Sequence, residues 1–446
     1  MAQKFKIVDY TTKYGSIMQF NRNKNTYIHG WYPFVEGYSK QFILSIIDEY
    51  KNINSCLPSL CLEPFCGSGT TPLELQKLGI ECKSFEVSPF MYNLAKVKLT
   101  NSYTVESFNK YYTKIKEYLN NPVENICALV NLNASKRIVE KDGLDKWNFD
   151  KDTMNGILDI KYSISKFNNS KYERLFTIAL ASILLEISNV YRNGKCISYK
   201  KKWKEQHITR KEVHEKFLVK LKEVFLPDIK LINTYKKNQK LLSNNNECYL
   251  GDVRKNLNKR VDDDSIDLVI TSPPYLNSRD YTDTYMIELR LLDYLKNDDD
   301  VKNLRKNTIR SHVQVKWNKS NNIGIKTLNN SIENLKKHES DFWNKGLINM
   351  IEGYFEDMSI LFDILYKKVK KDGLIFFNVA NSAYHNIEIK TDEIIAEIAE
   401  KSGFTVIEIR EARRINPSSQ QKENIPFLRE SVIVIKKVST STKLCI

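Results

Sequence analysis

The sequence predicts a doubly wound α/β protein with a mostly parallel, seven-stranded sheet and a helical insertion. The first observation behind this prediction is a strand, a glycine-rich loop, a helix and a second strand in direct succession over residues 60–86, which form a βαβ unit with parallel pairing. The second is a change of character over residues 101–240, where glycine becomes scarce and apolar residues recur with helical period. Apolar strands then return later in the chain.

The expected elements follow one another in a regular order. Apolar residues after Tyr38 fit a helix, and the helix behind the glycine loop should end at Gly79, because glycine is a common C-cap residue. The seven strands are expected at residues 60–62, 82–86, 247–252, 266–272, 373–379, 404–410 and 430–437. A polar loop separates the last two, which predicts a closing antiparallel pair. The apolar stretch 175–187 predicts a buried helix within the insertion.

The composition is that of a globular protein, and its net charge indicates a polyanionic partner. The 446 residues are 41% hydrophobic, and 24 Tyr with 20 Phe supply a large core. The formal net charge of +15 points to nucleic acid, although codon usage that favours Lys, Asn and Ile would also raise the charge. Within the insertion, eleven Lys or Arg oppose four Glu between residues 192 and 223.

The cysteines and histidines indicate neither disulfides nor a metal site. None of the eight Cys forms a CxxC pair, and none of the six His has a partner at metal-ligand spacing. Free thiols in a reducing cytoplasm are the simplest explanation. The chain opens without the apolar run of a signal peptide, and its most apolar stretch is too short to span a bilayer. We therefore expect a cytoplasmic protein with no membrane contact.

The glycine loop, EPFCGSGTT, has the features of a nucleoside-cofactor site. A phosphate-binding P-loop would need Lys where Thr70 follows the last glycine, and a dinucleotide fingerprint would need a third glycine where Pro72 stands. S-adenosylmethionine is the third option, because its methionine end carries no phosphate and a loop of this kind lets the backbone approach it. Glu63 suits the ammonium group of this cofactor, and Phe65 would line its pocket. A tight turn without a ligand is the other interpretation of the loop taken alone.

Two further acids at strand ends favour the cofactor over an empty turn. Glu86 ends the second strand, 23 residues after Glu63, where a carboxylate accepts hydrogen bonds from both ribose hydroxyls. Asp252 ends the third strand and is placed to accept a hydrogen bond from the adenine amino group. Open α/β sheets bind ligands outside the carboxyl ends of their strands, so the three acids are expected at one site.

The stretch DLVITSPPY ends a strand abruptly. An apolar strand, residues 268–270, runs into Ser272, Pro273, Pro274 and Tyr275. Each proline lacks an N–H and has a fixed φ, so the strand cannot continue. A rigid, exposed turn with an aromatic ring is therefore expected, and an exposed ring in such a place indicates a partner that stacks on it.

The two loops together resemble those of the amino-methylating, site-specific DNA methyltransferases of restriction–modification systems, which modify N4 of cytosine or N6 of adenine. The resemblance rests on EPFCGSGTT, on TSPPY and on the lead-in helix within residues 29–47. It implies the class I S-adenosylmethionine-dependent methyltransferase fold. The cofactor residues that it implies are Glu63, Pro64, Phe65, Cys66, Gly67, Gly69, Thr70, Thr71, Glu86 and Asp252. Double-stranded DNA is the implied substrate, with a cognate restriction endonuclease as a possible partner.

The chemistry of this family explains the residues of the second loop. An exocyclic amine is a poor nucleophile, because its lone pair is delocalised into the ring. The Ser272 hydroxyl and the Pro273 carbonyl would accept hydrogen bonds from the amino group, and Pro274 would keep the loop rigid. Tyr275 would stack on a base that has been rotated out of the duplex. Transfer is then direct, and the Pro-Cys pair of a C5-cytosine methyltransferase does not occur in the chain.

The first residue of the second loop predicts the target base. In this family Ser usually accompanies cytosine N4, whereas Asp or Asn usually accompanies adenine N6. We therefore predict a DNA methyltransferase specific for cytosine N4. The alternatives, in order, are an adenine-N6 DNA methyltransferase, an RNA amino-methyltransferase and a non-catalytic DNA-binding protein that keeps the cofactor fold.

The predicted organisation is one methyltransferase domain in two parts. Residues 1–100 carry the cofactor loop, residues 241–446 carry the catalytic loop, and the insertion at 101–240 is the main candidate for target recognition. Residues 297–350 are a second candidate DNA-contacting segment, because the stretch 301–319 has six basic residues and no acid. This stretch would clamp a phosphate backbone or form a solvated basic loop.

The residues between the catalytic loop and this basic stretch divide into two groups. Tyr285, Leu289 and Leu292 recur with helical spacing and are expected to pack in the core. Arg279, Asp280 and Tyr281 are near enough to the catalytic loop to contact the flipped base or its phosphate.

Overall fold

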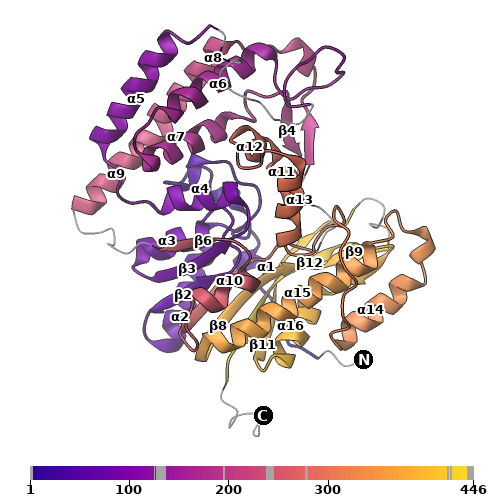
Figure 1. The fold of residues 1–446 in the computed structure, drawn as a ribbon. Helices are drawn as coiled ribbons and strands as arrows, with labels where there is room; N and C mark the ends of the chain where they lie inside the picture. The colour runs from indigo at the N-terminus through magenta and orange to yellow at the C-terminus, as the bar shows by residue number, and fades with distance from the viewer. Residues whose placement is uncertain are drawn as a thin grey trace.

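The computed structural model describes residues 4–124, 126, 137–193, 196–237, 246–276, 280–418, 421 and 424–438. A body built on one large sheet carries a separate lobe of helices, which lies above the sheet in Figure 1. The lobe comes from the middle of the chain, between two strands of the sheet.

The main sheet has eight strands in the order β1-β11-β12-β8-β7-β2-β3-β6. Its strands are β1 (Ile7–Asp9), β2 (Leu60–Glu63), β3 (Glu81–Glu86), β6 (Glu247–Leu250), β7 (Ile266–Thr271), β8 (Val369–Ala380), β11 (Thr405–Ile415) and β12 (Leu428–Lys436). Only β12 runs antiparallel to its neighbours in this sheet. The doubly wound sheet and the closing antiparallel pair are therefore confirmed.

The eighth strand, β1, is an addition to the seven that the sequence predicts. It is three residues long and pairs in parallel with β11 at the edge of the sheet. Three residues are too few to show a period, so the pattern of the sequence does not distinguish this strand from a loop.

Helices cover both faces of the sheet, because alternate strand residues point to opposite sides. Leu374 and Phe376 of β8 face the core beneath α2 (Lys40–Asn54) and α3 (Thr70–Leu78). Ile375 and Phe377 face the core formed with α10 (Val253–Arg260), α15 (Leu347–Lys368) and α16 (Thr391–Lys401). The helix α3 ends at Leu78 before a left-handed Gly79, as predicted.

The lobe between β3 and β6 is mainly helical. Its helices are α5 (Val105–Asn120), α6 (Lys151–Ser165), α7 (Ser170–Ile183), α8 (Arg210–Lys220) and α9 (Leu226–Lys237), with a π-helical turn (Leu221–Phe225) between the last two. It also contains an antiparallel hairpin that the sequence does not predict, β4 (Val190–Asn193) with β5 (Cys196–Tyr199). The core of the lobe continues through α4 (Pro89–Leu99) into α12 (Met286–Leu291), so the lobe is packed onto the sheet body.

The segment after β7 forms short helices and a second hairpin. These elements are α11 (Tyr281–Thr284), α12, α13 (Asp298–Asn307), α14 (Lys326–Lys336), β9 (Ser382–Tyr384) and β10 (Ile387–Ile389). A four-residue helix, α1 (Thr11–Tyr14), precedes the glycine loop. Tyr285, Leu289 and Leu292 are buried, as expected. Within the described residues, no helix has both the length and the hydrophobicity that crossing a membrane requires.

Candidate active site

A cavity of about 520 Å³ lies where β2, β3, β6 and β7 end. Thirteen of the fourteen residues predicted for the cofactor and catalytic loops line it, although they come from four separate stretches of the chain. This is the carboxyl edge of the parallel strands, where open α/β sheets bind ligands. The volume is within the range of cavities that hold a small molecule or cofactor.

Gly69 is the predicted cofactor residue that does not line the cavity. It has φ +82° and precedes α3, and a Cβ at this position would lie 3.0 Å from Ala95 of α4. Gly67 does line the cavity, with φ +51°, and a Cβ there would lie 3.4 Å from the Phe34 ring. The second glycine therefore allows the loop to pack closely against α4, whereas the first lies at the cavity wall beside Phe34, and both have the positive φ that favours glycine.

Glu63 holds the glycine loop to the neighbouring strand. Its side chain is buried, and it accepts hydrogen bonds from the Tyr38 hydroxyl at 2.7 Å, the Thr71 hydroxyl at 2.9 Å and the Phe65 N–H at 3.0 Å. The Thr271 hydroxyl at the end of β7 donates a fourth. Burial raises the pKa of Glu63 to about 7. Both carboxylate oxygens are thus occupied by the protein, and a contact with a cofactor ammonium stays a prediction.

Glu86 and Asp252 also brace the backbone around the cavity. Glu86 accepts hydrogen bonds from the N–H groups of Gly67 and Ser88, each at 2.7 Å, and burial raises its pKa to about 7. Asp252 caps α10 and is paired with Arg254 at 2.8 Å. Both acids line the cavity. Glu63 and Glu86 end β2 and β3 as predicted, whereas β6 ends at Leu250 and Asp252 follows it as the N-cap of α10.

The catalytic loop follows β7 directly, because the strand ends at Thr271 before the two prolines. The exposed ring predicted at Tyr275 is wrong: the side chain is partly buried. Its hydroxyl donates to Glu430 at 2.6 Å and accepts from the Asn378 amide at 2.7 Å. The Ser272 hydroxyl lies 3.4 Å from the same oxygen. The ring still lines the cavity, but from a fixed position.

Three residues of this network are absent from the sequence prediction. Asn378 is on β8, Arg413 is on β11 and Glu430 is near the start of β12, and all three line the cavity. The Arg413 guanidinium donates to the carboxylate of Glu430. Since β12 is antiparallel, its beginning lies at the carboxyl edge of the parallel strands. An acid at the start of an apolar closing strand was the signal that would have found Glu430.

Two arginines from the basic stretches form ion pairs inside the protein instead of facing solvent. Arg192 of β4 pairs with Glu288 at 2.6 Å, and its guanidinium lies 4.4 Å from the centre of the Tyr285 ring. Arg310 pairs with Asp357 at 2.7 Å. Within residues 301–319, Arg305 and Arg310 are paired with acids, whereas Lys302, Lys306, Lys316 and Lys319 are exposed. DNA contact by this stretch stays a prediction.

The segment after the catalytic loop is held to this same stretch. Arg305 pairs with both Asp280 and Asp283. Asp280 and Tyr281 line the cavity, as their predicted proximity to the base requires. Arg279 lies outside the described residues.

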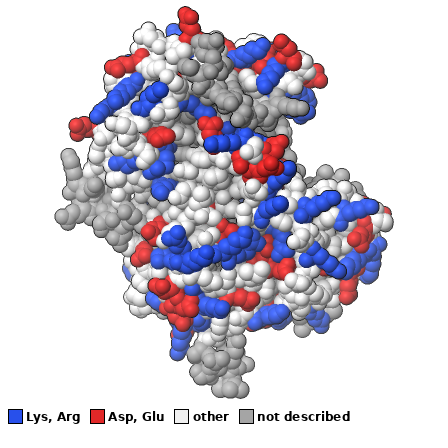
Figure 2. Space-filling view, viewed as in Figure 1, with Lys and Arg blue, Asp and Glu red and all other residues white. Residues whose placement is uncertain are grey.

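Exposed Lys and Arg are found on both the sheet body and the lobe. Figure 2 shows a band of Lys and Arg over the region of α10, where Lys255, Lys259 and Arg260 are exposed. On the lobe, Lys201 and Lys202 are exposed as well. Lys200 differs, because its ammonium donates to the backbone carbonyls of Glu186 and Ser188.

The order of the strands defines the class of the protein. From β6 to β11 the sheet has the arrangement of the class I S-adenosylmethionine-dependent methyltransferases, with the one reversed strand, β12, between β8 and β11. S-adenosylmethionine is the methyl donor that this class implies. The cavity fits it, with the glycine loop forming one wall and Glu63, Glu86 and Asp252 lining it at the carboxyl edge of the sheet.

Comparison with known proteins refines this class. The chain is 26% identical over 475 residues to the type II methyltransferase M.BsoBI of Geobacillus stearothermophilus. This alignment covers 97% of the present chain and 90% of M.BsoBI. It is 27% identical to M.AvaI of Nostoc sp. (88% and 82% covered) and 24% identical to M.MvaI of Kocuria varians (76% and 74% covered). The chain is thus similar over most of its length to several type II methyltransferases.

Two other comparisons add little. No protein-family profile matches the chain. The rRNA methyltransferase aviRa of Streptomyces viridochromogenes aligns over 91% of this chain and 87% of its own, at 9% identity and a TM-score of 0.29. A score this low carries no argument, so the fold assignment rests on the strand order.

Proposed function

We propose that the protein transfers a methyl group from S-adenosylmethionine to the exocyclic amino group of a base in double-stranded DNA, with cytosine N4 as the target. The observation that carries this proposal is the shared cavity. Ser272 and Tyr275 of the second loop line the same space as Gly67, Glu86 and Asp252 of the cofactor strands. A donor bound at one end therefore faces a base at the other.

The cofactor end of the cavity offers a set of complementary groups. When bound, S-adenosylmethionine supplies a methyl group activated by a sulfonium centre. Glu86 would accept hydrogen bonds from the ribose hydroxyls, and Asp252 would accept one from the adenine amino group. Pro64, Phe65, Cys66, Thr70 and Thr71 would form the wall around the methionine part.

The base end supplies acceptors and a platform. The Ser272 hydroxyl and the Pro273 carbonyl would accept hydrogen bonds from the target amine, which localises the nitrogen lone pair. Tyr275 would stack on the flipped base. Its hydroxyl is already held by Glu430 and Asn378, so little side-chain freedom remains to be lost when the base enters.

The state of Cys66 supports direct transfer without a covalent enzyme–base intermediate. Cys66 lines the cavity, but its thiol has a pKa raised well above the usual value by the hydrogen bond with Cys248 and by burial. A thiol in this state is protonated at neutral pH and is a weak nucleophile. The amine of the base is then the attacking group, and Ser272 is the residue that points to cytosine.

We further propose that the lobe over residues 101–240 reads the target sequence, with residues 297–350 as a second DNA-contacting segment. Two observations support the lobe. Its hairpin reaches the cavity wall through the contact of Arg192 with Tyr285, and Lys201 and Lys202 are exposed on its surface. These proposals imply that the protein is a cytoplasmic modification enzyme and that its partner is a cognate restriction endonuclease.

The experiment that tests the proposed function identifies the methylated nucleoside. The purified chain is incubated with S-adenosylmethionine and unmethylated DNA, and the digest is analysed by mass spectrometry beside a Ser272→Ala control. N4-methylcytosine is the expected product. N6-methyladenine would overturn the choice of base, and a product found only with RNA would overturn DNA as substrate. Absence of any methylated nucleoside from both would refute the enzymatic function.

A further inference from the structure

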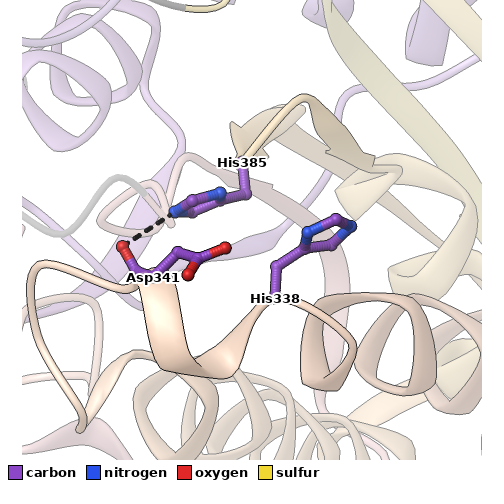
Figure 3. Close-up of side chains that lie close together, drawn as sticks. All are labelled: His338, Asp341 and His385. Carbon is purple, nitrogen blue, oxygen red and sulfur yellow. Dashed lines mark hydrogen bonds between the residues drawn. The ribbon is translucent and has the colours of Figure 1, made fainter.

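Three metal-binding side chains meet at the surface of the sheet body. His338 follows α14, Asp341 ends the short 3-10 helix Glu339–Asp341, and His385 is in the turn between β9 and β10 (Figure 3). One ligand atom from each lies within 4.8 Å of the others. The two histidines are 47 residues apart in the chain, so spacing along the sequence, which predicts no metal site, does not reveal the group.

The structure orients the His385 ring for coordination. Its Nε2 lies 3.2 Å from the backbone carbonyl of Asp341. Since a carbonyl only accepts, Nε2 donates this hydrogen bond, and in the neutral ring Nδ1 is then the nitrogen with a lone pair for a metal. This outer hydrogen bond to a carbonyl is common for metal-bound histidines. The ring stacks with that of His338, with the centroids 5.9 Å apart and the planes at 15°. Its centroid lies 5.1 Å from the centroid of the Phe342 ring.

We propose that His338, Asp341 and His385 bind a divalent transition-metal ion, with water completing the coordination. Two imidazoles and one carboxylate form a ligand set that suits Zn²⁺. Ligands of tetrahedral Zn²⁺ lie about 3.4 Å apart for metal–ligand distances of about 2.1 Å, so the three atoms must approach by roughly 1 Å. His338 and Asp341 are exposed, which leaves their side chains room to rotate. The nearby Lys337 ammonium is bound to Asn334 at 2.8 Å.

The metal would stabilise the support of the catalytic loop. Ser382 and Tyr384 of β9 both donate hydrogen bonds to the carbonyl of Leu276, the latter at 3.2 Å. Leu276 directly follows Tyr275. An ion that ties the turn after β9 to the end of α14 would therefore restrict the hairpin on which this loop rests. The site is a structural one, and its existence does not depend on which base is methylated.

Zinc titration of the full chain tests the proposal. The protein is stripped of metal with a chelator, and ZnCl₂ binding is measured by calorimetry in the parent, His338→Ala and His385→Asn. Asn tolerates the left-handed backbone of residue 385, where φ is +49°. Each variant should lose affinity about tenfold or more. The matched control, His207→Ala, changes an exposed histidine of the lobe that pairs with Asp150, and it should bind like the parent.

A spectroscopic probe excludes binding by thiols. Co²⁺ in the parent should show the visible bands of nitrogen and oxygen coordination, without thiolate charge-transfer bands, and both His variants should lose them. Zn²⁺ should raise the Tm of the parent but not that of the double variant. One Zn²⁺ per chain is the expected stoichiometry. The proposal is overturned if the parent does not bind one Zn²⁺ per chain or if the two variants bind as tightly as the parent. A Co²⁺ spectrum typical of thiolate ligands would also overturn it.

Discussion

Glu430→Ala should impair catalysis although Glu430 is far from the glycine loop in sequence. The Glu430 side chain is 2% exposed and accepts hydrogen bonds from the Tyr275 hydroxyl at 2.6 Å and the Asn378 amide at 3.2 Å. Arg413 pairs with the other carboxylate oxygen. Removing Glu430 therefore frees the Tyr275 ring and leaves the Arg413 guanidinium without its partner.

The size of the effect follows from one hydrogen bond to a charged group. Such a bond contributes about 1.5–3 kcal/mol, which corresponds to roughly 10- to 150-fold in the population of correctly placed Tyr275. We expect kcat to fall by this factor, whereas the affinity for S-adenosylmethionine should change little. Stability should also fall, by less than a fully buried ion pair would cost, because the Arg413 side chain is 29% exposed.

The assay is single-turnover methyl transfer, combined with calorimetry of cofactor binding. Tyr275→Phe keeps the ring and removes the hydroxyl, so it should lose the same interaction. The double variant should then be no worse than the more impaired single variant. Independent, additive losses would refute the proposed anchoring, as would normal kcat in Glu430→Ala. The matched control is Glu411→Ala, which removes the partner of an exposed arginine on β11, Arg414.

Three further predictions concern the cofactor, the base and the DNA. Ser272→Ala should lower kcat by about 10²–10³-fold while cofactor affinity stays near that of the parent, as measured by methyl transfer and calorimetry. Cofactor affinity should fall as the pH drops below about 7, because burial raises the Glu86 pKa to about 7 and a protonated carboxyl cannot accept both ribose hydrogen bonds. Glu86→Gln should weaken this dependence, and the part that remains is expected from Glu63, whose pKa is also raised to about 7. Replacing Lys201 and Lys202 by Gln should reduce the slope of log affinity for DNA against log salt by up to about two.

Each of these variants has a control at the amino ends of the parallel strands, away from the cavity at their carboxyl ends. Ser265→Ala precedes β7, Glu81→Gln begins β3, and Lys371→Gln is near the start of β8; all three should behave like the parent. A Ser272→Ala enzyme with weakened cofactor binding would contradict its place at the base end. A pH dependence that is unchanged in Glu86→Gln would assign the titration to another group, and an unchanged salt slope would remove this face of the lobe from the DNA footprint.

The parts of the site that the sequence predicted are those with local causes. The prolines end β7 after Thr271, and Gly79 ends α3, because each residue restricts or permits the backbone at its own position. The periods of apolar residues located the seven strands for the same reason. Glu63, Glu86 and Asp252 were found because they follow such strands, and parallel strands bring their carboxyl ends together.

The sequence by itself determined seven of the eight strands of the main sheet, the two loops and the chemistry that their residues permit. Only the tertiary structure decided that Tyr275 is anchored by Glu430, that Arg192 is buried against Tyr285, and that His338 meets His385. These contacts join residues 47 to 155 positions apart. Their geometry depends on how helices and strands pack together, and packing leaves no periodic signal in the chain.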